Sequence, residues 1–216
     1  MFVVERFTFP ELSEPRRDVP APEGPLVTWP ECDATETASA CADAAQRILR
    51  QLSPDRPRLV VFTSPDDGDG KTGVLIALAP ELAKRTTGNI LAVDANFHKP
   101  DLTARLNVPA NNAIAQPALI YPTNLPRLSV LPAPAVQGLQ RRGLDSRQSE
   151  ELREGWSLVL VDTASLVHPE VAPMTRGCDG VYLVVRLGHT ARRAVAEAAR
   201  LIRAAGGQLL GCLVVI

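Results

Sequence analysis

One loop of the sequence gathers the residue types that bind phosphate groups. An apolar run from Leu59 to Phe62 leads into a glycine-punctuated loop, and a second apolar segment begins at Val74. This order is typical of a phosphate-binding P-loop, because glycines let successive backbone N–H groups face one concavity and a helix N-terminus adds partial positive charge. We therefore predict that the phosphates of a nucleotide contact the consecutive residues Gly68, Asp69, Gly70, Lys71, Thr72 and Gly73.

Lys71 and Thr72 have the most specific chemistry in this loop. A lysine ammonium group at this position reaches the β- and γ-phosphates, and a threonine hydroxyl is a ligand for Mg²⁺. Asp94 and Asp162 each end an apolar run elsewhere in the chain. A strand-end aspartate met alone often only caps a turn or a helix. Next to a Gly-x-Gly-Lys-Thr loop, however, two such carboxylates favour a site for Mg²⁺ and a nucleotide.

The elements that must position these residues are apolar runs alternating with helical segments. Strands are predicted at residues 59–62, 90–94, 128–131, 158–162, 180–186 and 209–216. Runs that are apolar on both faces and alternate with helices predict an α/β fold with a mainly parallel sheet, in the three-layer α/β/α arrangement of P-loop nucleotide hydrolases. Ligands of open α/β sheets bind outside the carboxyl ends of the strands, so Lys71, Asp94 and Asp162 should meet at one edge.

The helical segments follow from propensity, capping and stop signals. Thr190 is predicted to cap the last helix, which Gly206 and Gly207 should end. Residues 107–127, rich in proline and asparagine, are predicted to be irregular. Helices are expected over residues 33–52, after the P-loop lysine, and over 101–106, 146–153, 169–176 and 190–205.

Length and composition bound the organisation of the chain. The 216 residues suit one domain, and 45% hydrophobic residues suffice for a core. Residues 1–31 contain six prolines and are predicted to form an extended arm outside the core, with residues 32–216 as the P-loop domain. The net charge of −1 gives no reason to expect nucleic acid as a partner. Scattered cysteines, and the lack of a secretory or bilayer-spanning stretch, predict a cytoplasmic protein.

Several segments together resemble one protein family. TSPDDGDGKT, residues 63–72, is similar to a Walker A motif with a Thr-Ser pair before the loop, and ILAVDANFHKP, residues 90–100, to a Walker A′ motif. LVLVDTAS, residues 158–165, is similar to a Walker B motif. From about Ala44 to the C-terminus the sequence therefore resembles the bacterial tyrosine kinases of capsule and exopolysaccharide biosynthesis, which are related to Min/Par-type P-loop ATPases.

The resemblance implies a tyrosine-protein kinase that transfers a phosphoryl group from Mg·ATP. ATP and Mg²⁺ are the implied cofactors, with Lys71 and Asp94 as catalytic residues and Asp94 as the candidate base. Thr72, Asp94 and Asp162 are the implied metal ligands. The implied partner is a membrane-embedded regulator of polysaccharide chain length, which would recruit the protein to the inner face of the membrane. Homo-oligomerisation is also implied, because Arg47 and Arg50 lie where the family has a Glu-x-x-Arg-x-x-Arg motif.

The chain departs from the family's pattern at positions that bear on activity. Asn96 replaces the second aspartate of Walker A′, His98 replaces an arginine, and Ser165 replaces a proline that shapes the Walker B loop. Ala44 stands where the oligomerisation motif has its glutamate. Carboxylates beside the phosphate loop, above all Asp67, should weaken nucleotide binding by on the order of 1 kcal/mol each.

Three hypotheses therefore remain open at this stage. The family continues into an adenine-contacting asparagine and a tyrosine cluster, whereas this sequence ends at Ile216. Tyr182 is expected in a buried strand, so Tyr121, in the irregular segment, is the candidate phosphate acceptor. The chain is an active tyrosine kinase, a catalytically impaired pseudo-kinase that serves as a regulatory binding module, or a Min/Par-like ATPase whose target is not a tyrosine.

Overall fold

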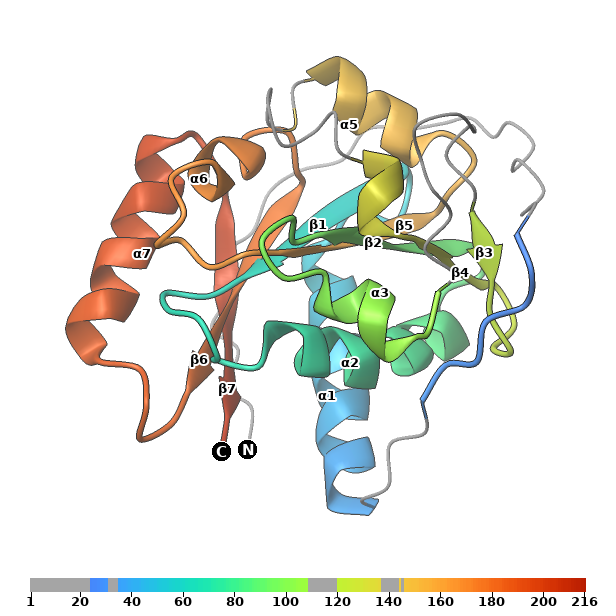
Figure 1. Cartoon of the computed structure of the whole chain (residues 1–216), viewed down its shortest axis with the longest axis horizontal. Helices are drawn as coiled ribbons and strands as arrows, with labels where there is room; N and C mark the ends of the chain where they lie inside the picture. The colour runs from blue at the N-terminus through green and yellow to red at the C-terminus, as the bar shows by residue number, and fades with distance from the viewer. Residues whose placement is uncertain (1–23, 31–34, 109–119, 137–143, 145) are drawn as a thin grey trace.

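A mainly parallel β-sheet forms the centre of the protein (Figure 1). The structure, a computed structural model, describes residues 24–30, 35–108, 120–136, 144 and 146–216. Within them the sheet has seven strands in the order β3-β4-β2-β5-β1-β6-β7, and only β3 runs antiparallel to its neighbour. The strands are β1 (Arg58–Thr63), β2 (Ile90–Ala95), β3 (Tyr121–Pro122), β4 (Leu128–Leu131), β5 (Leu158–Thr163), β6 (Gly180–Arg186) and β7 (Leu209–Val215).

Helices cover both faces of this sheet (Figure 1). Residues of α1, α2 and α3 share one hydrophobic cluster with one face of the strands, and residues of α5, α6 and α7 share a second cluster with the other. Strands β1, β2 and β5 are buried along their whole length, which explains their continuous apolar runs. The helices are α1 (Thr35–Gln51), α2 (Lys71–Arg85), α3 (Asp101–Arg105), the 3₁₀ turn η1 (Ala133–Val136), α5 (Ser146–Arg153), α6 (Val171–Met174) and α7 (Arg192–Ala204).

The predicted three-layer α/β/α fold is therefore confirmed, with two local corrections. Residues 107–127 are not irregular throughout, because Tyr121 and Pro122 form an edge strand paired with β4. A two-residue strand that contains proline gives no recognisable period, so the sequence alone did not reveal it. Thr190 is not the N-cap of α7 either. The N-cap is Ala191, and the Thr190 hydroxyl donates to the Asp69 carboxylate instead.

The segment of residues 24–30 packs on the domain instead of lying outside its core. Val27 forms a β-bridge with Thr123, and Trp29 is 1% exposed. The Trp29 backbone N–H donates to Asn124 Oδ1 at 2.6 Å, and its indole N–H donates to the carbonyl of Ile76 at 3.0 Å. The expectation of an extended arm is therefore wrong for these residues; residues 1–23 and 31 of the proposed arm lie outside the described part of the chain.

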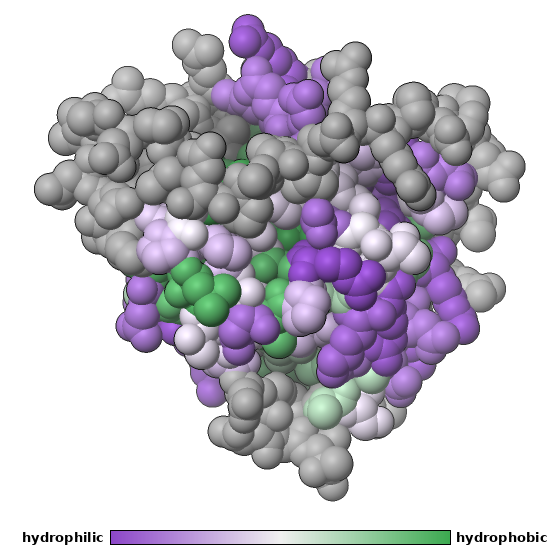
Figure 2. Space-filling view, turned by 90° about the vertical axis from the view of Figure 1, so that its right-hand side faces the viewer, coloured by the Kyte–Doolittle hydropathy of each residue, from purple (hydrophilic) through white to green (hydrophobic). Residues whose placement is uncertain are grey.

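The surface on the β3 side mixes hydrophobic and hydrophilic side chains (Figure 2). Leu26, in the segment just described, is 69% exposed, whereas Val27 and Trp29 are buried. No helix among the described residues is both long and apolar enough to cross a bilayer.

Candidate nucleotide site

The loop between β1 and α2 has the backbone shape of a phosphate-binding loop. Gly68 and Gly70 have φ angles of 85° and 90°, a region that other residues rarely adopt. A Cβ atom at Gly68 would meet nothing within 4 Å, so its backbone angle, and not lack of space, requires glycine there. Gly70 is the N-cap of α2, and Lys71 is the first residue of that helix. The helix N-terminus therefore faces the loop, where it favours an anion.

Lys71 is held inside this loop. Its side chain is buried, and Nζ donates to Ser64 Oγ at 2.9 Å, while Ser64 Oγ donates to the carbonyl of Asp66 at 2.6 Å. Burial lowers the pKa of Lys71, and the nearby carboxylates, first of all Asp162, oppose that shift. Ser64 was not among the predicted site residues. The Thr-Ser pair before the loop was the sequence signal that could have identified it.

Thr72 and Asp162 meet directly. Thr72 Oγ1 donates to Asp162 Oδ2 at 2.6 Å, and Asp162 is fully buried. Oδ1 of the same carboxylate is buried without a hydrogen-bond partner among the described residues. Burial, to which the charge of neighbouring Asp94 adds, raises the pKa of Asp162 to about 7 against the opposing effect of the Thr72 hydrogen bond. A hydroxyl beside a buried carboxylate oxygen that lacks a partner is a donor set that fits Mg²⁺, which prefers oxygen ligands.

Asp94 lies beside Asp162 at the carboxyl edge of the sheet, because the two residues are paired in register between β2 and β5. Both Asp94 oxygens are already hydrogen-bonded. Oδ1 accepts from the Asn96 backbone N–H at 3.1 Å, and Oδ2 accepts from the backbone N–H and the hydroxyl of Thr103 at 2.8 and 2.7 Å. Burial nevertheless raises the pKa of Asp94. These bonds let Asp94 fix the loop before α3. Oδ1 accepts one hydrogen bond among the described residues, so a role as base or metal ligand would fall to its second lone pair.

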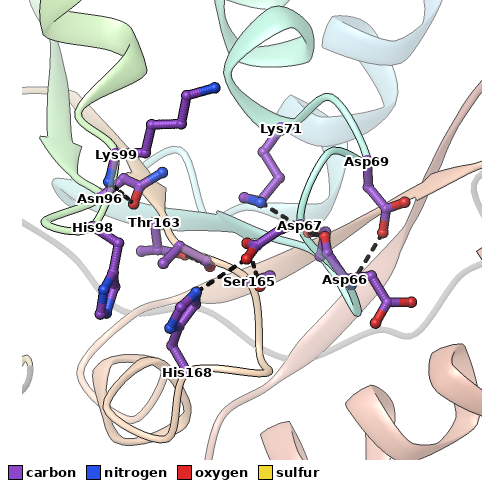
Figure 3. Close-up of polar contacts among 12 residues, drawn as sticks. Asp66, Asp67, Asp69, Lys71, Asn96, His98, Lys99, Thr163, Ser165 and His168 are labelled. Atoms are coloured by element: carbon purple, nitrogen blue, oxygen red, sulfur yellow. Dashed lines mark hydrogen bonds and ion pairs between the residues drawn. The ribbon is translucent and has the colours of Figure 1, made fainter.

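The three aspartates of the loop have different environments (Figure 3). Asp69 is fully buried, and its carboxylate accepts from the Thr190 hydroxyl at 2.7 Å and contacts His189 Nδ1 at 3.1 Å. Its side chain thus ties the loop to the segment before α7. Asp66 points away from the Lys71 ammonium group (Figure 3).

Asp67 is turned toward the loop after β5 (Figure 3). Ser165 Oγ donates to Asp67 Oδ1 at 2.6 Å, and His168 Nε2 lies 3.2 Å from Oδ2. The Ser165 hydrogen bond lowers the pKa of Asp67, so the carboxylate is anionic. Ser165, which stands where the resembled family has proline, therefore joins the Walker B loop to the phosphate loop by its hydroxyl.

Asn96, at the Walker A′ position, acts through its amide. Asn96 Oδ1 accepts from the Lys99 backbone N–H at 3.1 Å, which closes the turn that contains His98. Asparagine makes this turn as well as aspartate does, but without the negative charge. His98 contacts Glu170 and stacks on His168, with ring centroids 3.9 Å apart.

Comparison with solved structures identifies the fold around this site. No family model and no curated protein sequence matches the chain. The kinase domain of VpsO matches with a TM-score of 0.69 and 24% identity, over 83% of this chain and 94% of that chain. The chain has a P-loop kinase and ATPase fold. The kinase domain of Escherichia coli tyrosine kinase ETK matches with a TM-score of 0.62 and 19% identity, over 80% of this chain and 74% of the other.

A third similar structure is the septum site-determining protein MinD from Pyrococcus horikoshii, solved in complex with Mg-ADP. It matches with a TM-score of 0.60 and 21% identity, over 72% of this chain and 68% of that chain. The neighbours thus include both tyrosine kinase domains and a Min-type ATPase, the two groups that the Walker motifs resemble.

Two further residues bear on how such a fold would act. Both tyrosines of the sequence are buried: Tyr121 is 1% exposed, and Tyr182 is fully buried with its hydroxyl donating to Gln51 Oε1 at 2.5 Å. The expectation that Tyr121 is an exposed phosphate acceptor is therefore wrong, since the residue lies in β3 and packs into the core. Burial also raises the pKa of Tyr182.

Proposed function

We propose that the chain binds Mg·ATP in the loop between β1 and α2. The observation that best supports this is the Thr72–Asp162 hydrogen bond at the N-terminus of a helix that begins with Lys71, beside Asp162 Oδ1, which has no partner in the part of the chain that the structure describes. Lys71 would hold the β- and γ-phosphates, and Thr72 and Asp162 would hold Mg²⁺ directly or through water. Mg²⁺ would neutralise the charge that develops on the phosphates during phosphoryl transfer.

The reaction proposed for this site is phosphoryl transfer from ATP, in the manner of a tyrosine-protein kinase of exopolysaccharide or capsule biosynthesis. Asp94 would serve as the base that accepts a proton from the attacking hydroxyl, through the second lone pair of Oδ1. The acceptor would be a tyrosine of another protein, because the two tyrosines of this sequence, Tyr121 and Tyr182, are both buried.

A second function is favoured by the bonding of Asp94. Its oxygens accept three hydrogen bonds, from Asn96 and from Thr103 in α3, and Asn96 supplies no second carboxylate. These contacts favour a pseudo-kinase that binds nucleotide as a signal without transferring phosphate. A Min/Par-like ATPase, in which water replaces the acceptor hydroxyl, is the third candidate. In all three, the proposed setting is the cytoplasm, with recruitment to the inner face of the membrane by a chain-length regulator.

Titration calorimetry with Mg·ATP tests the shared claim of nucleotide binding. The unaltered chain should bind, and Lys71→Met should bind at least about 10-fold more weakly, because a charged hydrogen bond contributes about 1.5–3 kcal/mol. Lack of binding by the unaltered chain would overturn the proposal. Equal affinity of the two proteins would place the nucleotide elsewhere.

Assays of turnover then separate the three functions. Phosphotyrosine formed on an added tyrosine peptide would support the kinase, and phosphate release without phosphotyrosine would support the ATPase. Binding with neither product would support the pseudo-kinase. Asp94→Asn is the informative variant: loss of product with unchanged Mg·ATP affinity is expected if Asp94 is the base, whereas loss of folded protein is expected if it only fixes the turn.

A further inference from the structure

Two histidines and a glutamate come together outside the nucleotide site. His98 lies in the turn after β2, and His168 and Glu170 lie in the loop between β5 and α6. One nitrogen of each ring and one Glu170 oxygen lie within 4.8 Å of one another. His98 Nε2 contacts Glu170 Oε1, and the two rings stack at 3.9 Å with an angle of 20° between their planes.

We propose that His98, His168 and Glu170 bind one divalent transition metal ion of the Zn²⁺ type. Two imidazoles and one carboxylate form the donor set of open, three-ligand zinc sites, whose fourth position is filled by water or another ligand. In a tetrahedral site with bonds of about 2.1 Å the ligand atoms lie about 3.4 Å apart, so the 4.8 Å cluster needs side-chain movements of about 1 Å.

The backbone around the three ligands is already ordered by hydrogen bonds. Asn96 Oδ1 accepts from the Lys99 N–H and so closes the turn that presents His98. The His168 N–H donates to the Ser165 carbonyl at 3.1 Å, and the His168 carbonyl accepts from the Val171 N–H at 3.1 Å. Because the loops are already ordered, they would lose little conformational entropy when a cation binds.

Asp67 supplies the supporting carboxylate that metal-binding histidines generally have. It lies 3.2 Å from His168 Nε2. If Nδ1 of His168 binds the metal, Asp67 orients the ring from the opposite side, as the outer partner in a carboxylate–histidine–zinc arrangement. If Nε2 binds, the contact between His168 and Asp67 is given up. In both geometries the ion would connect the loops after β2 and β5, and with Nδ1 as the ligand Asp67 would join them to the phosphate loop.

The cluster is accessible from solvent, as a site that exchanges its metal must be. The side chains of His98, His168 and Glu170 are 44%, 25% and 27% exposed. Without a metal the same atoms form a contact between His98 and Glu170 and a ring stack, and surface pairs of charged or polar groups contribute only about 0–1 kcal/mol. A metal ion would satisfy the Glu170 carboxylate and both rings at once.

Zn²⁺ titration of the chelator-treated, nucleotide-free chain tests this proposal. The chain has three histidines, which provides a matched control. His98→Gln and His168→Gln should each weaken Zn²⁺ binding by at least about 10-fold, since even outer partners of metal ligands are worth 10–100-fold. His189→Gln, which removes the histidine bound to Asp69, should leave Zn²⁺ affinity unchanged. Equal affinity of all four proteins would overturn the proposal.

Histidine ring NMR signals provide a measurement that does not depend on the folding of any variant. One equivalent of Zn²⁺ should shift or broaden the signals of two of the three rings and leave the third in place. Co²⁺ in place of Zn²⁺ should give a tetrahedral visible spectrum without a thiolate charge-transfer band. Three unperturbed rings, or a thiolate band from the cysteines, would contradict the site. Because ATP is absent throughout, the outcome is independent of whether the chain binds nucleotide.

Discussion

At the residue scale, Asp162 is the side chain on which the nucleotide site depends most. Its carboxylate is buried, holds Thr72 through one oxygen and leaves the other without a partner in the described structure. Burial raises its pKa from 3.8 to about 7. The charged form that Mg²⁺ needs is thus disfavoured in the free protein below about pH 7.

This shift predicts how stability depends on pH. Between about pH 4 and pH 7 the folded chain retains a proton on Asp162 that the unfolded chain releases, so the free energy of unfolding should fall as pH rises through that window. Asp94, whose pKa is also raised, acts in the same direction. Urea unfolding should show that the free energy of unfolding falls more between about pH 5 and pH 8 for the unaltered chain than for Asp162→Asn. An equal fall in both proteins would contradict a buried, protonated Asp162 carboxylate.

Asp67 gives a second prediction at this scale. It is anionic, 65% exposed, and among the carboxylates that raise the pKa of Lys71. Asp67→Asn should therefore tighten Mg·ATP binding, by about fivefold if the repulsion is about 1 kcal/mol. Asp66→Asn is the matched control, because Asp66 points away from Lys71 and should have little effect (Figure 3). Weaker binding by Asp67→Asn, or equal effects of both variants, would count against repulsion by this carboxylate.

At the scale of elements, the contact between the phosphate loop and the segment before α7 was the main feature that sequence patterns did not reveal. Thr190 had the sequence context of a helix cap, yet its hydroxyl donates to Asp69 and accepts from the Arg186 N–H at 2.8 Å. Thr190 and Asp69 are 121 positions apart in the sequence, so no local spacing pattern connects them. The Asp69 carboxylate, predicted beside the phosphates, is instead used to anchor the loop.

Removing this anchor should destabilise the protein. Thr190→Val deletes two hydrogen bonds and leaves the buried Asp69 carboxylate with fewer partners, so a loss of about 1–3 kcal/mol in the free energy of unfolding is expected. Thr87→Val, at an exposed threonine, should change it by less than about 0.5 kcal/mol. Chemical denaturation measures both. Equal, small effects would mean that the anchor contributes little.

Helix α1 has the arginines but not the glutamate of the family's oligomerisation motif. Arg47 and Arg50 are exposed, as a partner-binding face requires. Ala44, in the position of the motif's glutamate, is 1% exposed and belongs to the hydrophobic cluster that α1 shares with α2 and the strands. A glutamate at position 44 would be a buried charge in this structure. The alanine that is present has no carboxylate to pair with Arg47 or Arg50. Homo-oligomerisation through this motif remains a prediction.

At the scale of the whole molecule, the order of elements and the edge where the site forms could be predicted from the sequence. Strands buried on both faces are continuous apolar runs, and parallel strands bring their carboxyl ends together, so Asp94 and Asp162 were expected side by side. The edge strand at Tyr121 and the packing of Trp29 could not be predicted, because both depend on contacts between segments distant in the sequence. The histidine–glutamate cluster was missed for the same reason.

The packing of residues 24–30 gives a prediction for the domain as a whole. Trp29 is almost fully buried, so Trp29→Ala should lower the free energy of unfolding by about 3–5 kcal/mol. Leu26→Ala, at a side chain that is 69% exposed, should have almost no effect. Denaturant melts of the two variants test whether this segment belongs to the folded domain. A Trp29→Ala protein as stable as Leu26→Ala would show that it does not.

The most direct test of Mg·nucleotide binding is ATP affinity measured by calorimetry with and without Mg²⁺, at about pH 8, for the unaltered chain and for Asp162→Asn. The unaltered chain should bind ATP more tightly with Mg²⁺ than without, since Thr72 and Asp162 provide the metal's ligands. Asp162→Asn should lose most of this Mg²⁺ dependence. A chain that binds no ATP in either condition, or a Mg²⁺ dependence unchanged by Asp162→Asn, would contradict nucleotide binding at this site.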